Sequence, residues 1–324
     1  MVWDGKPGFY EVWYFTLTDP GTGLGAWIRL TMVAPVSGDP TCSLWFLTMD
    51  PRSREVVGRK ASFPIDRLHA TADPFRLEVG DAHLGDHGSA GSFEDVAWDL
   101  RWEPGRGYEH VNPFLQKAKI AKTVLVLPHA DVAATGTITL PGGSTVQVDG
   151  ARNGQAHLWG SKHANRWAWA HCSDFVTTEG EPAPDTFVDG VSVFVPRFGR
   201  EVGPSTPVVG RFLGEDFAST KPLNVLRNQS EFALTTWRFE AVDGKRKIVG
   251  EVDAQRDLLA GVTYHDPDGD LAYCYNSCAS SMRLAVFDKS GGEWHHRQTL
   301  VSDGRAHFEY AQREPIGDLT LHTT

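Results

Sequence analysis

Short runs of apolar, aromatic and β-branched residues, each ending at a turn signal, recur along the whole chain. Phe9 to Leu17 is followed by Asp19-Pro20-Gly21, Ala26 to Ala34 ends at Pro35, and Leu44 to Met49 ends at Asp50-Pro51. Regularly spaced short strands with turn signals between them are typical of a sandwich or a barrel. Further strands are expected at 75–79, 93–102, 123–127, 136–140, 145–149, 155–159, 167–175, 191–195, 232–240, 247–253, 262–266, 271–276, 283–288 and 306–310.

Helical pattern is scarce in comparison. Residues 112–120, with Pro113 in the first turn, predict one short helix, and residues 254–260 predict another. A chain of 324 residues suits two domains of about 150 residues each. The polar, Pro-containing stretch 177–186 is the best linker candidate. The pattern therefore predicts an all-β protein with domains at 1–180 and 181–324.

The net charge of the chain and the length of its apolar runs limit the kinds of partner that it is expected to have. Lys and Arg total 31 against 41 for Asp and Glu, a formal net charge of −10. Nucleic-acid affinity depends on clustered cations, so no nucleic-acid partner is expected. Nowhere do 18 apolar residues run together, so no transmembrane segment is expected. The sequence leaves the oligomeric state open.

The four cysteines, at 42, 172, 274 and 278, favour a reduced, cytoplasmic protein. On one extended strand Cys274 and Cys278 lie about 13 Å apart, too far for a disulfide. Their spacing lacks paired CxxC, and no GxSxG, Walker loop, GxGxxG or HExxH occurs. No metal and no cofactor is therefore expected. Asp266 to Asp270 lacks the spacing of a calcium loop and predicts a hairpin turn.

Polar residues share strand faces with aromatic ones near the middle of the chain. In a strand, residues two apart point the same way, so Trp167, Trp169 and His171 form one face, and His157 and Trp159 form another. With a hairpin loop at 161–166, the two strands could form one sheet carrying three tryptophans and two histidines. Such a cluster favours a polar pair in an aromatic pocket that exchanges protons near neutral pH. The alternative is a structural core with hydrogen-bonded histidines, and a metal site at His157, His163 and His171 is weaker still.

The first strand repeats this combination, since Glu11 shares a face with Trp13. A carboxylate among aromatics must be paired, protonated or facing water. If it faces a cavity, burial would raise its pKa and make it a candidate acid, with Arg29 as a candidate partner. The candidate catalytic residues are therefore Glu11, His157 and His171. The candidate substrate-binding residues are Trp13, Arg29, Trp159, Trp167, Trp169, Tyr264, Tyr275 and Asn276.

The stretch Gly154-Gln-Ala-His157-Leu-Trp159-Gly160, followed by Trp167-Ala-Trp169 and Phe175, resembles the G-x-x-H-x-W-G…W-x-W-x-x-x-x-F signature of carotenoid 1,2-hydratases and AttH-like proteins. Tocopherol cyclases look related. The resemblance implies two lipocalin-like antiparallel β-barrels in tandem, with the ligand within or between them. It also implies isoprenoid or polyketide substrates that are hydrated or cyclised. The chain has Gln155 and Ala156 where a Tyr and an acidic residue are expected, so the hydratase proton donor would have to lie elsewhere.

Three functions remain open on the sequence. The first is a cofactor-independent cyclase, hydratase or isomerase that acts on a hydrophobic, isoprenoid- or polyketide-like molecule in an aromatic-lined pocket. The second is a non-catalytic, lipocalin-like carrier of a lipid, pigment or terpenoid, which the same lining would serve. The third, carbohydrate binding, requires the tryptophan cluster to be exposed to solvent.

Overall fold

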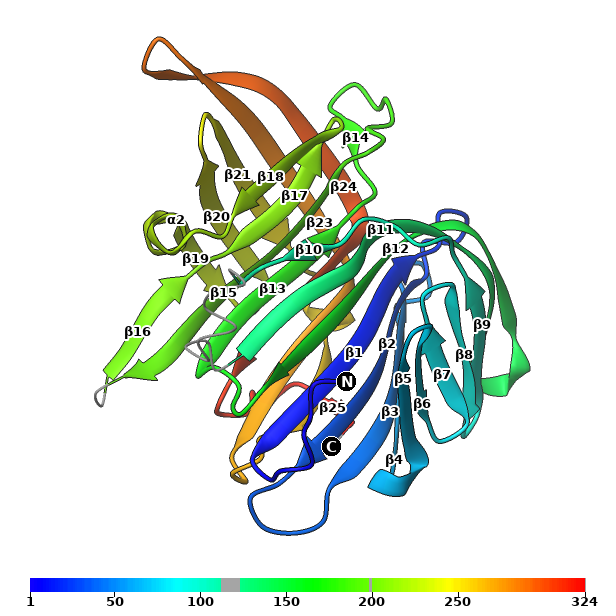
Figure 1. Ribbon diagram of the computed structural model, residues 1–324. Helices are drawn as coiled ribbons and strands as arrows, with labels where there is room; N and C mark the ends of the chain where they lie inside the picture. Colours follow the sequence, from blue (N-terminus) through cyan, green and yellow to red (C-terminus); the bar gives the residue numbers. More distant parts are fainter. Residues whose placement is uncertain (112–122, 198–199, 324) are drawn as a thin grey trace.

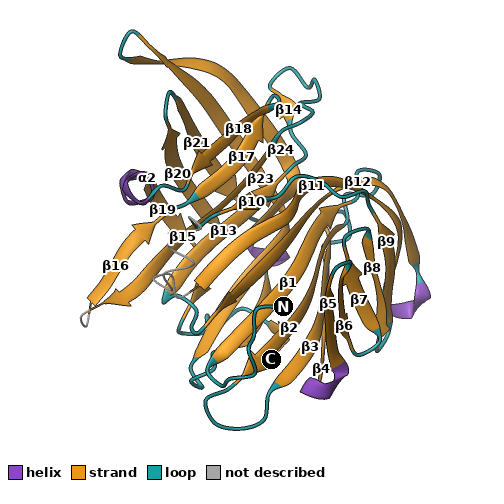
Figure 2. Cartoon of the chain, viewed as in Figure 1, coloured by secondary structure: helices purple, strands orange, loops and turns teal. Residues whose placement is uncertain are grey.

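The computed structural model describes residues 1–111, 123–197 and 200–323. Over these residues the chain is almost entirely β-structure, and the predicted all-β class is confirmed (Figure 2). The predicted helix at 112–120 lies outside the described residues. The one predicted at 254–260 is a single 3₁₀ turn, Arg256–Leu258, because the flanking residues adopt extended backbone angles.

The first half forms a 12-stranded, nearly closed barrel-like sheet in the order β4-β3-β2-β1-β12-β11-β9-β8-β7-β6-β5, with β10 on β11 (Figure 1). Consecutive hairpins make most of this order, and β1 closes it by pairing with the distant β12. Its strands are β1 (Phe9–Thr18), β2 (Gly25–Ala34), β3 (Thr41–Asp50), β4 (Glu55–Pro64), β5 (Leu68–Ala72), β6 (Phe75–Val79), β7 (Ala82–Gly85), β8 (Gly88–Phe93), β9 (Val96–Arg101), β10 (Tyr108–Glu109), β11 (Thr123–Thr139) and β12 (Thr145–Gly160), with 3₁₀ turns at Ile65–Arg67 and Pro141–Gly143.

The second half forms a 13-stranded sheet in the order β18-β17-β15-β13-β24-β23-β21-β20-β19, with β14, β16, β22 and β25 paired off this path. Its ends approach each other, since the Ser219 hydroxyl of β18 donates to the Val242 carbonyl of β20. Its elements are β13 (Arg166–Cys172), β14 (Val176–Thr177), β15 (Phe187–Arg197), β16 (Arg200–Ser205), β17 (Val208–Phe212), β18 (Glu215–Ser219), α2 (Pro222–Arg227), β19 (Gln229–Ala233), β20 (Thr236–Asp243), β21 (Arg246–Asp253), β22 (Ala260–His265), β23 (Leu271–Ser290), β24 (Glu293–Gln312) and β25 (Leu321–Thr323).

The chain passes from the first sheet to the second at residues 161–165, upstream of the stretch 177–186 whose composition suggested a linker. The expectation that the strands around His157 and His171 form one hairpin in one sheet is wrong. β12 pairs with β1 and β11, whereas β13 pairs with β15 and β24. Strand periodicity identifies the two faces of each strand but not its neighbours, so sequence alone could not separate them.

Side chains alternate between two different cores on β1. Trp13, Phe15 and Leu17 point into the first sheet, where they join an apolar cluster that includes Phe46, Trp98 and Trp102. Tyr10, Val12 and Tyr14 point outward and pack against Trp167, Trp169 and Tyr264 of the second sheet. The outer face of the first sheet is therefore buried by the second, and the layer between them is rich in aromatic residues.

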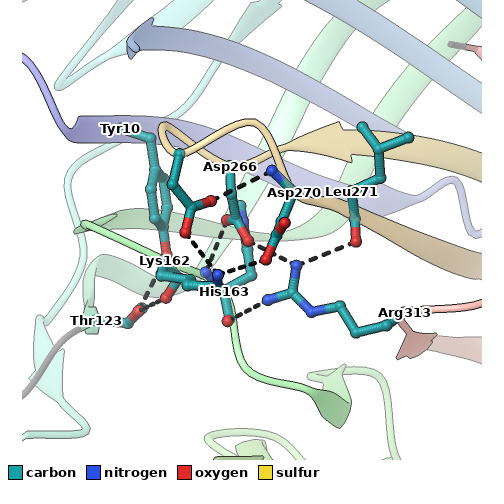
Figure 3. Close-up of polar contacts among 9 residues, drawn as sticks. Tyr10, Thr123, Lys162, His163, Asp266, Asp270, Leu271 and Arg313 are labelled. Atoms are coloured by element: carbon teal, nitrogen blue, oxygen red, sulfur yellow. Dashed lines mark hydrogen bonds and ion pairs between the residues drawn. The ribbon is translucent and has the colours of Figure 1, made fainter. Parts of the chain in front are cut away.

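A cluster of ion pairs and hydrogen bonds holds the loop that connects the two sheets (Figure 3). The buried Asp266 carboxylate, in the turn between β22 and β23, accepts hydrogen bonds from the backbone N–H and Nδ1 of His163 at 2.8 and 2.7 Å and from Arg313 at 2.6 Å. The His163 ring stacks on Tyr10, 4.3 Å between ring centroids. Lys162 pairs with Asp268 and Asp270 in the same turn. The loop that joins the sheets is thus held to both of them.

Asp266 makes the stability of this cluster depend on pH. Burial opposes its ionisation, but His163 and Arg313 outweigh that effect and lower the pKa of Asp266 from 3.8 to about 2. The resulting stabilisation, about 2 kcal/mol, is fully present above pH 4 and is lost as the pH falls towards 2. Asp266→Asn should lower the free energy of unfolding at pH 7 by about 2–4 kcal/mol and flatten its pH dependence between pH 4 and 2. Denaturant unfolding at a series of pH values measures both effects.

The matched control is Asp270→Asn in the same turn. Asp270 is exposed and shares Lys162 with Asp268, so this variant should change the free energy of unfolding by less than about 1 kcal/mol. Equal losses for the two variants would contradict the role of Asp266 as the central group of the cluster.

Candidate functional site

The first sheet contributes a cross-strand row of large polar and aromatic side chains to the layer between the sheets. Tyr14 of β1, Arg29 of β2, Trp45 of β3 and Lys60 of β4 are successive register partners, so they share one face. The Arg29 guanidinium lies 4.2 Å from the ring centroid of Tyr264 and also lies near the rings of Trp27 and Trp45. Stacking of this kind stabilises a buried guanidinium.

The second sheet faces this row with side chains from four strands. Trp169 of β13, Glu309 of β24 and Asn276 of β23 are register partners, and Trp167, Ala311 and Cys274 form the adjacent row. Tyr264 of β22 completes the wall. Trp169 meets Tyr14 of the first sheet edge to face, 5.6 Å between ring centroids. The site is therefore assembled from both sheets, and each supplies one wall.

Asp189 of β15 is the most heavily hydrogen-bonded acid of this layer. Its fully buried carboxylate accepts bonds from His110 Nε2 at 2.9 Å, from His171 Nδ1 at 3.1 Å and from Trp169 Nε1 at 3.1 Å. Burial opposes ionisation here, but the hydrogen bonds from His110 and His171 outweigh it and hold the pKa of Asp189 below its usual value. Asp189 is therefore a carboxylate at neutral pH.

Glu309 has the opposite electrostatic environment. Its carboxyl group contacts only weak partners, Trp167 Nε1 at 3.4 Å and Cys274 Sγ at 3.6 Å. Burial raises the pKa of Glu309, and the Arg29 charge only partly opposes the effect. The side chain nevertheless keeps some solvent-accessible surface. Burial of this kind favours the protonated form of a carboxyl group.

His171 connects Asp189 to the first sheet. Its Nδ1 bonds Asp189, and its Nε2 has no hydrogen-bond partner among the described residues. Gly154 of β12 lies directly against that nitrogen, since a Cβ at this position would stand 2.5 Å from Nε2. The first glycine of the G-x-x-H signature therefore makes room for a histidine of the other sheet.

The predicted site residues divide into two groups. Arg29, Trp167, Trp169, His171, Tyr264 and Asn276 come together between the sheets. Glu11, Trp13, His157 and Trp159 share the opposite face of the first sheet, so the expected single site combining Glu11, His157 and His171 does not form. The reason is that β12 and β13 belong to different sheets.

Glu11 and His157 form a pair of their own. The fully buried Glu11 carboxylate accepts bonds from the backbone N–H groups of Val2 and Trp3 and from His157 Nε2 at 2.8 Å. Arg29, the partner expected for Glu11, points to the other face of the sheet. The His157 ring stacks on Trp13, 4.9 Å between ring centroids, and burial lowers its pKa although Glu11 opposes this. The carboxylate therefore anchors the N-terminal segment.

The structure also changes the expectations for Tyr275 and for carbohydrate binding on exposed tryptophans. Tyr275 is fully buried on the inner face of the second sheet, where its hydroxyl accepts the Ile316 N–H, so it does not face the layer. Trp13, Trp167 and Trp169 are 1%, 7% and 4% exposed. Carbohydrate binding on exposed tryptophans is therefore excluded for these residues.

Asp189, His110 and Glu309 were not among the candidates from the sequence. The alternation that singled out Trp167, Trp169 and His171 was equally available in 306–310, where His307 and Glu309 share a face. Asp189 precedes the expected strand 191–195 and therefore escaped notice. His110 lies just after β10 (Tyr108–Glu109), outside any predicted strand, and no pattern in the sequence points to it.

A groove of about 520 Å³ opens at the edge of the layer, between β2–β4 and the turn after β22. Thr31, Ser43, Trp45, Lys60 and His265 are among its lining residues. Among the described residues no group of three His, Cys, Asp or Glu side chains could hold a metal ion. The described helices include none that is long and apolar enough to span a membrane. The four cysteines are free and buried.

Comparisons with solved structures decide the fold. An AttH-like protein of Nitrosomonas europaea aligns with 94% of this chain and 93% of its own, at a TM-score of 0.55 and 12% identity. The chain has the AttH-like fold. Kievitone hydratase of Nectria haematococca (TM-score 0.55, 8% identity, 95% of this chain and 89% of that chain) and CghA bound to Sch210972 (0.56, 9%, 94% and 88%) share it.

The sequence itself matches no family model. An uncharacterized protein of Mycobacterium tuberculosis strain H37Rv is 28% identical over 301 residues, which cover 90% of this chain and 84% of that protein. The resemblance to AttH-like proteins noted in the sequence is thus confirmed for the fold.

His307, the register partner of His171, allows a test of how strongly the layer between the sheets excludes water. Burial lowers the pKa of His307 from 6.5 to about 3. Unfolding then takes up one proton at this residue between pH 6.5 and 3, so its contribution to stability is complete above pH 6.5 and declines below it. His307→Gln should reduce the slope of unfolding free energy against pH near pH 5 by about 1.4 kcal/mol per pH unit. Exposed His87→Gln is the control and should leave the slope nearly unchanged.

Proposed function

We propose that this protein is a cofactor-independent enzyme that protonates a double bond of a hydrophobic, isoprenoid- or polyketide-like molecule and so promotes its hydration, cyclisation or isomerisation. The observation that carries the proposal is a pair of carboxyl groups in one layer, the partly buried Glu309 and the fully buried Asp189, whose pKa values are displaced in opposite directions, Glu309 upward and Asp189 downward. Such a pair separates the roles of acid and base at a single pH.

Glu309 is the acid in this proposal. It transfers its proton to one carbon of the double bond, and the π electrons form the new C–H bond, leaving a carbocation at the other carbon. The faces of Trp167, Trp169 and Tyr264 surround that position and can each stabilise the cation by ~1–2 kcal/mol when desolvated. A pocket that excludes bulk water delays capture of the cation until the correct nucleophile is in place.

His171 with Asp189 is the base. Asp189 holds Nδ1–H of His171, as in catalytic histidines that a carboxylate orients. When water or an internal hydroxyl attacks the cation, its proton passes to the His171–Asp189 pair. When no nucleophile attacks, loss of a proton from the neighbouring carbon completes an isomerisation. His110, on the other side of Asp189, holds the carboxylate in place.

The comparisons support the class of reaction without reaching the substrate. A protein named as a hydratase shares the fold over nearly its whole length, and the low identity limits that likeness to the fold. The carrier function remains the alternative, because an aromatic layer binds an apolar molecule whether or not it is transformed.

Glu309→Gln should lower turnover by roughly 10²–10⁴-fold while the fold is retained, because the amide keeps the shape of the acid but donates no proton. Turnover is measured by incubating the protein with terpenoid and polyketide alkenes in D₂O and following products by mass spectrometry. Deuterium on carbon, with or without the added mass of one water, reports protonation of the double bond.

Glu11→Gln is the matched control, since Glu11 is a buried acidic residue on the opposite face of the first sheet, outside the layer. It should retain turnover. Loss of turnover in Glu11→Gln but not in Glu309→Gln would move the acid to the inside of the first sheet. Release of every bound compound unchanged by the wild-type protein would favour the carrier.

A further inference from the structure

The side of the second half that carries α2 and the β15–β16 hairpin exposes several large apolar side chains. Leu223 and Leu226 of α2 are 66% and 71% exposed, and Val195 and Val202, register partners in the hairpin, are 38% and 46% exposed. Apolar side chains exposed singly are ordinary on a protein surface. Four of them on two neighbouring elements indicate a contact with something outside the chain.

The two elements lie against each other. The backbone N–H of Thr206, directly after β16, donates to the carbonyl of Val225 in α2 at 3.3 Å, and the Asn228 side chain donates to the Thr206 carbonyl at 2.7 Å. Figure 1 shows both elements projecting from the same side of the second sheet. No residue of α2 is buried, and Leu223 and Leu226, three positions apart, share one side of the helix. The leucines therefore lie on a projecting surface and contribute little to the apolar core.

Unpaired cations accompany these apolar side chains. Lys221 and Arg227 flank the leucines of α2, and Arg200 begins β16. All three are exposed, and none of their side chains forms an ion pair or a hydrogen bond with a residue that the structure describes. We call the seven residues the α2 face: Val195, Arg200, Val202, Lys221, Leu223, Leu226 and Arg227.

The acids nearby do not cancel this positive charge. α2 contains no acid, and Glu201 of β16 is paired with Arg166. Glu240 of β20, a strand that contacts α2, is paired with Lys247. The charge left unpaired on α2 and β16 is therefore positive, in a chain whose net charge is −10.

An anionic lipid bilayer matches both properties of the α2 face. Apolar side chains enter the boundary between head groups and acyl chains, while lysine and arginine are attracted to anionic head groups. A stable interface with a protein buries roughly 1,200–2,000 Å² in total, more than four aliphatic side chains on a projecting surface supply. The geometry therefore favours a lipid surface over a second protein.

We propose that the α2 face docks the protein onto an anionic bilayer, with Leu223 and Leu226 between the head groups and Lys221, Arg227 and Arg200 against their negative charges. The docking does not depend on the proposed function, because α2 and β16 supply none of the groups assigned to catalysis. Apolar molecules concentrate in bilayers, so docking holds the protein where an apolar ligand is available. The contact is weak and reversible, since few side chains leave water.

Sedimentation with lipid vesicles tests the docking. The wild-type protein should bind phosphatidylcholine vesicles that contain about one-third phosphatidylserine roughly tenfold more strongly than pure phosphatidylcholine vesicles, and high salt should remove this preference. The double variant Leu223→Gln, Leu226→Gln should bind the anionic vesicles roughly tenfold more weakly, because it no longer transfers two apolar side chains from water. The double variant Lys221→Gln, Arg227→Gln should lose about tenfold on anionic vesicles only.

Val36→Gln and Arg52→Gln are the matched controls. Val36 is 64% exposed in the turn between β2 and β3, and Arg52 is exposed in the turn between β3 and β4, so both lie on the first sheet, outside the α2 face. Each should bind anionic vesicles as the wild type does. All substituted side chains are exposed, so every variant should keep the melting temperature of the wild type within a few degrees.

Weaker binding by both double variants, with unchanged controls, supports the docking. It is overturned if the wild type does not sediment with anionic vesicles, if it binds neutral and anionic vesicles equally, or if either double variant binds like the wild type. Light scattering without vesicles examines the remaining occupant, a second copy of the chain. Self-association that the leucine variant abolishes would assign the α2 face to a contact between copies and overturn the docking.

Discussion

Burial of charged groups between two sheets is the constraint on which this architecture depends. Each sheet has an apolar core of its own, but the face that it turns to its neighbour carries Arg29 on one side and Asp189 and Glu309 on the other. Burying such groups is tolerated only where hydrogen bonds, aromatic faces or a displaced pKa offset the lost hydration. All three solutions occur here within one layer. The same buried charged groups therefore determine both how the sheets pack and what chemistry the candidate site can perform.

The cluster around Asp266 shows how the layer is held in register. The joining loop could move freely if it only had to connect two strands, yet His163 is bonded to the second sheet and stacked on Tyr10 of the first. Small displacements of one sheet against the other would separate Arg29 from Tyr264 and Trp169 from Tyr14. A rigid connection next to the site keeps these groups at fixed distances, which proton transfer requires.

Strand periodicity was enough to predict the fold class and to place Trp167, Trp169 and His171 on one face of a strand. It did not indicate that β12 and β13 belong to different sheets, because a strand pattern does not specify which strands pair. For that reason Glu11 and His157 were joined with His171 although a sheet lies between them. Arg29 was given the wrong partner, since the two faces of β1 could not be oriented and Arg29 lies on the face opposite to Glu11. Glu309 was not selected from the sequence, because the burial that raises its pKa is known only from the tertiary structure.

The pairing of β1 with β12 also has a consequence for the order in which the molecule assembles. Trp13 and His157 lie side by side although almost half of the chain separates them in sequence. The β1–β4 hairpins can form as soon as they leave the ribosome, but the first sheet closes only after β12 has been synthesised. Its aromatic outer face then stays exposed until the second sheet arrives. The layer that forms the site is thus completed last, and during that interval it is the surface most prone to aggregation.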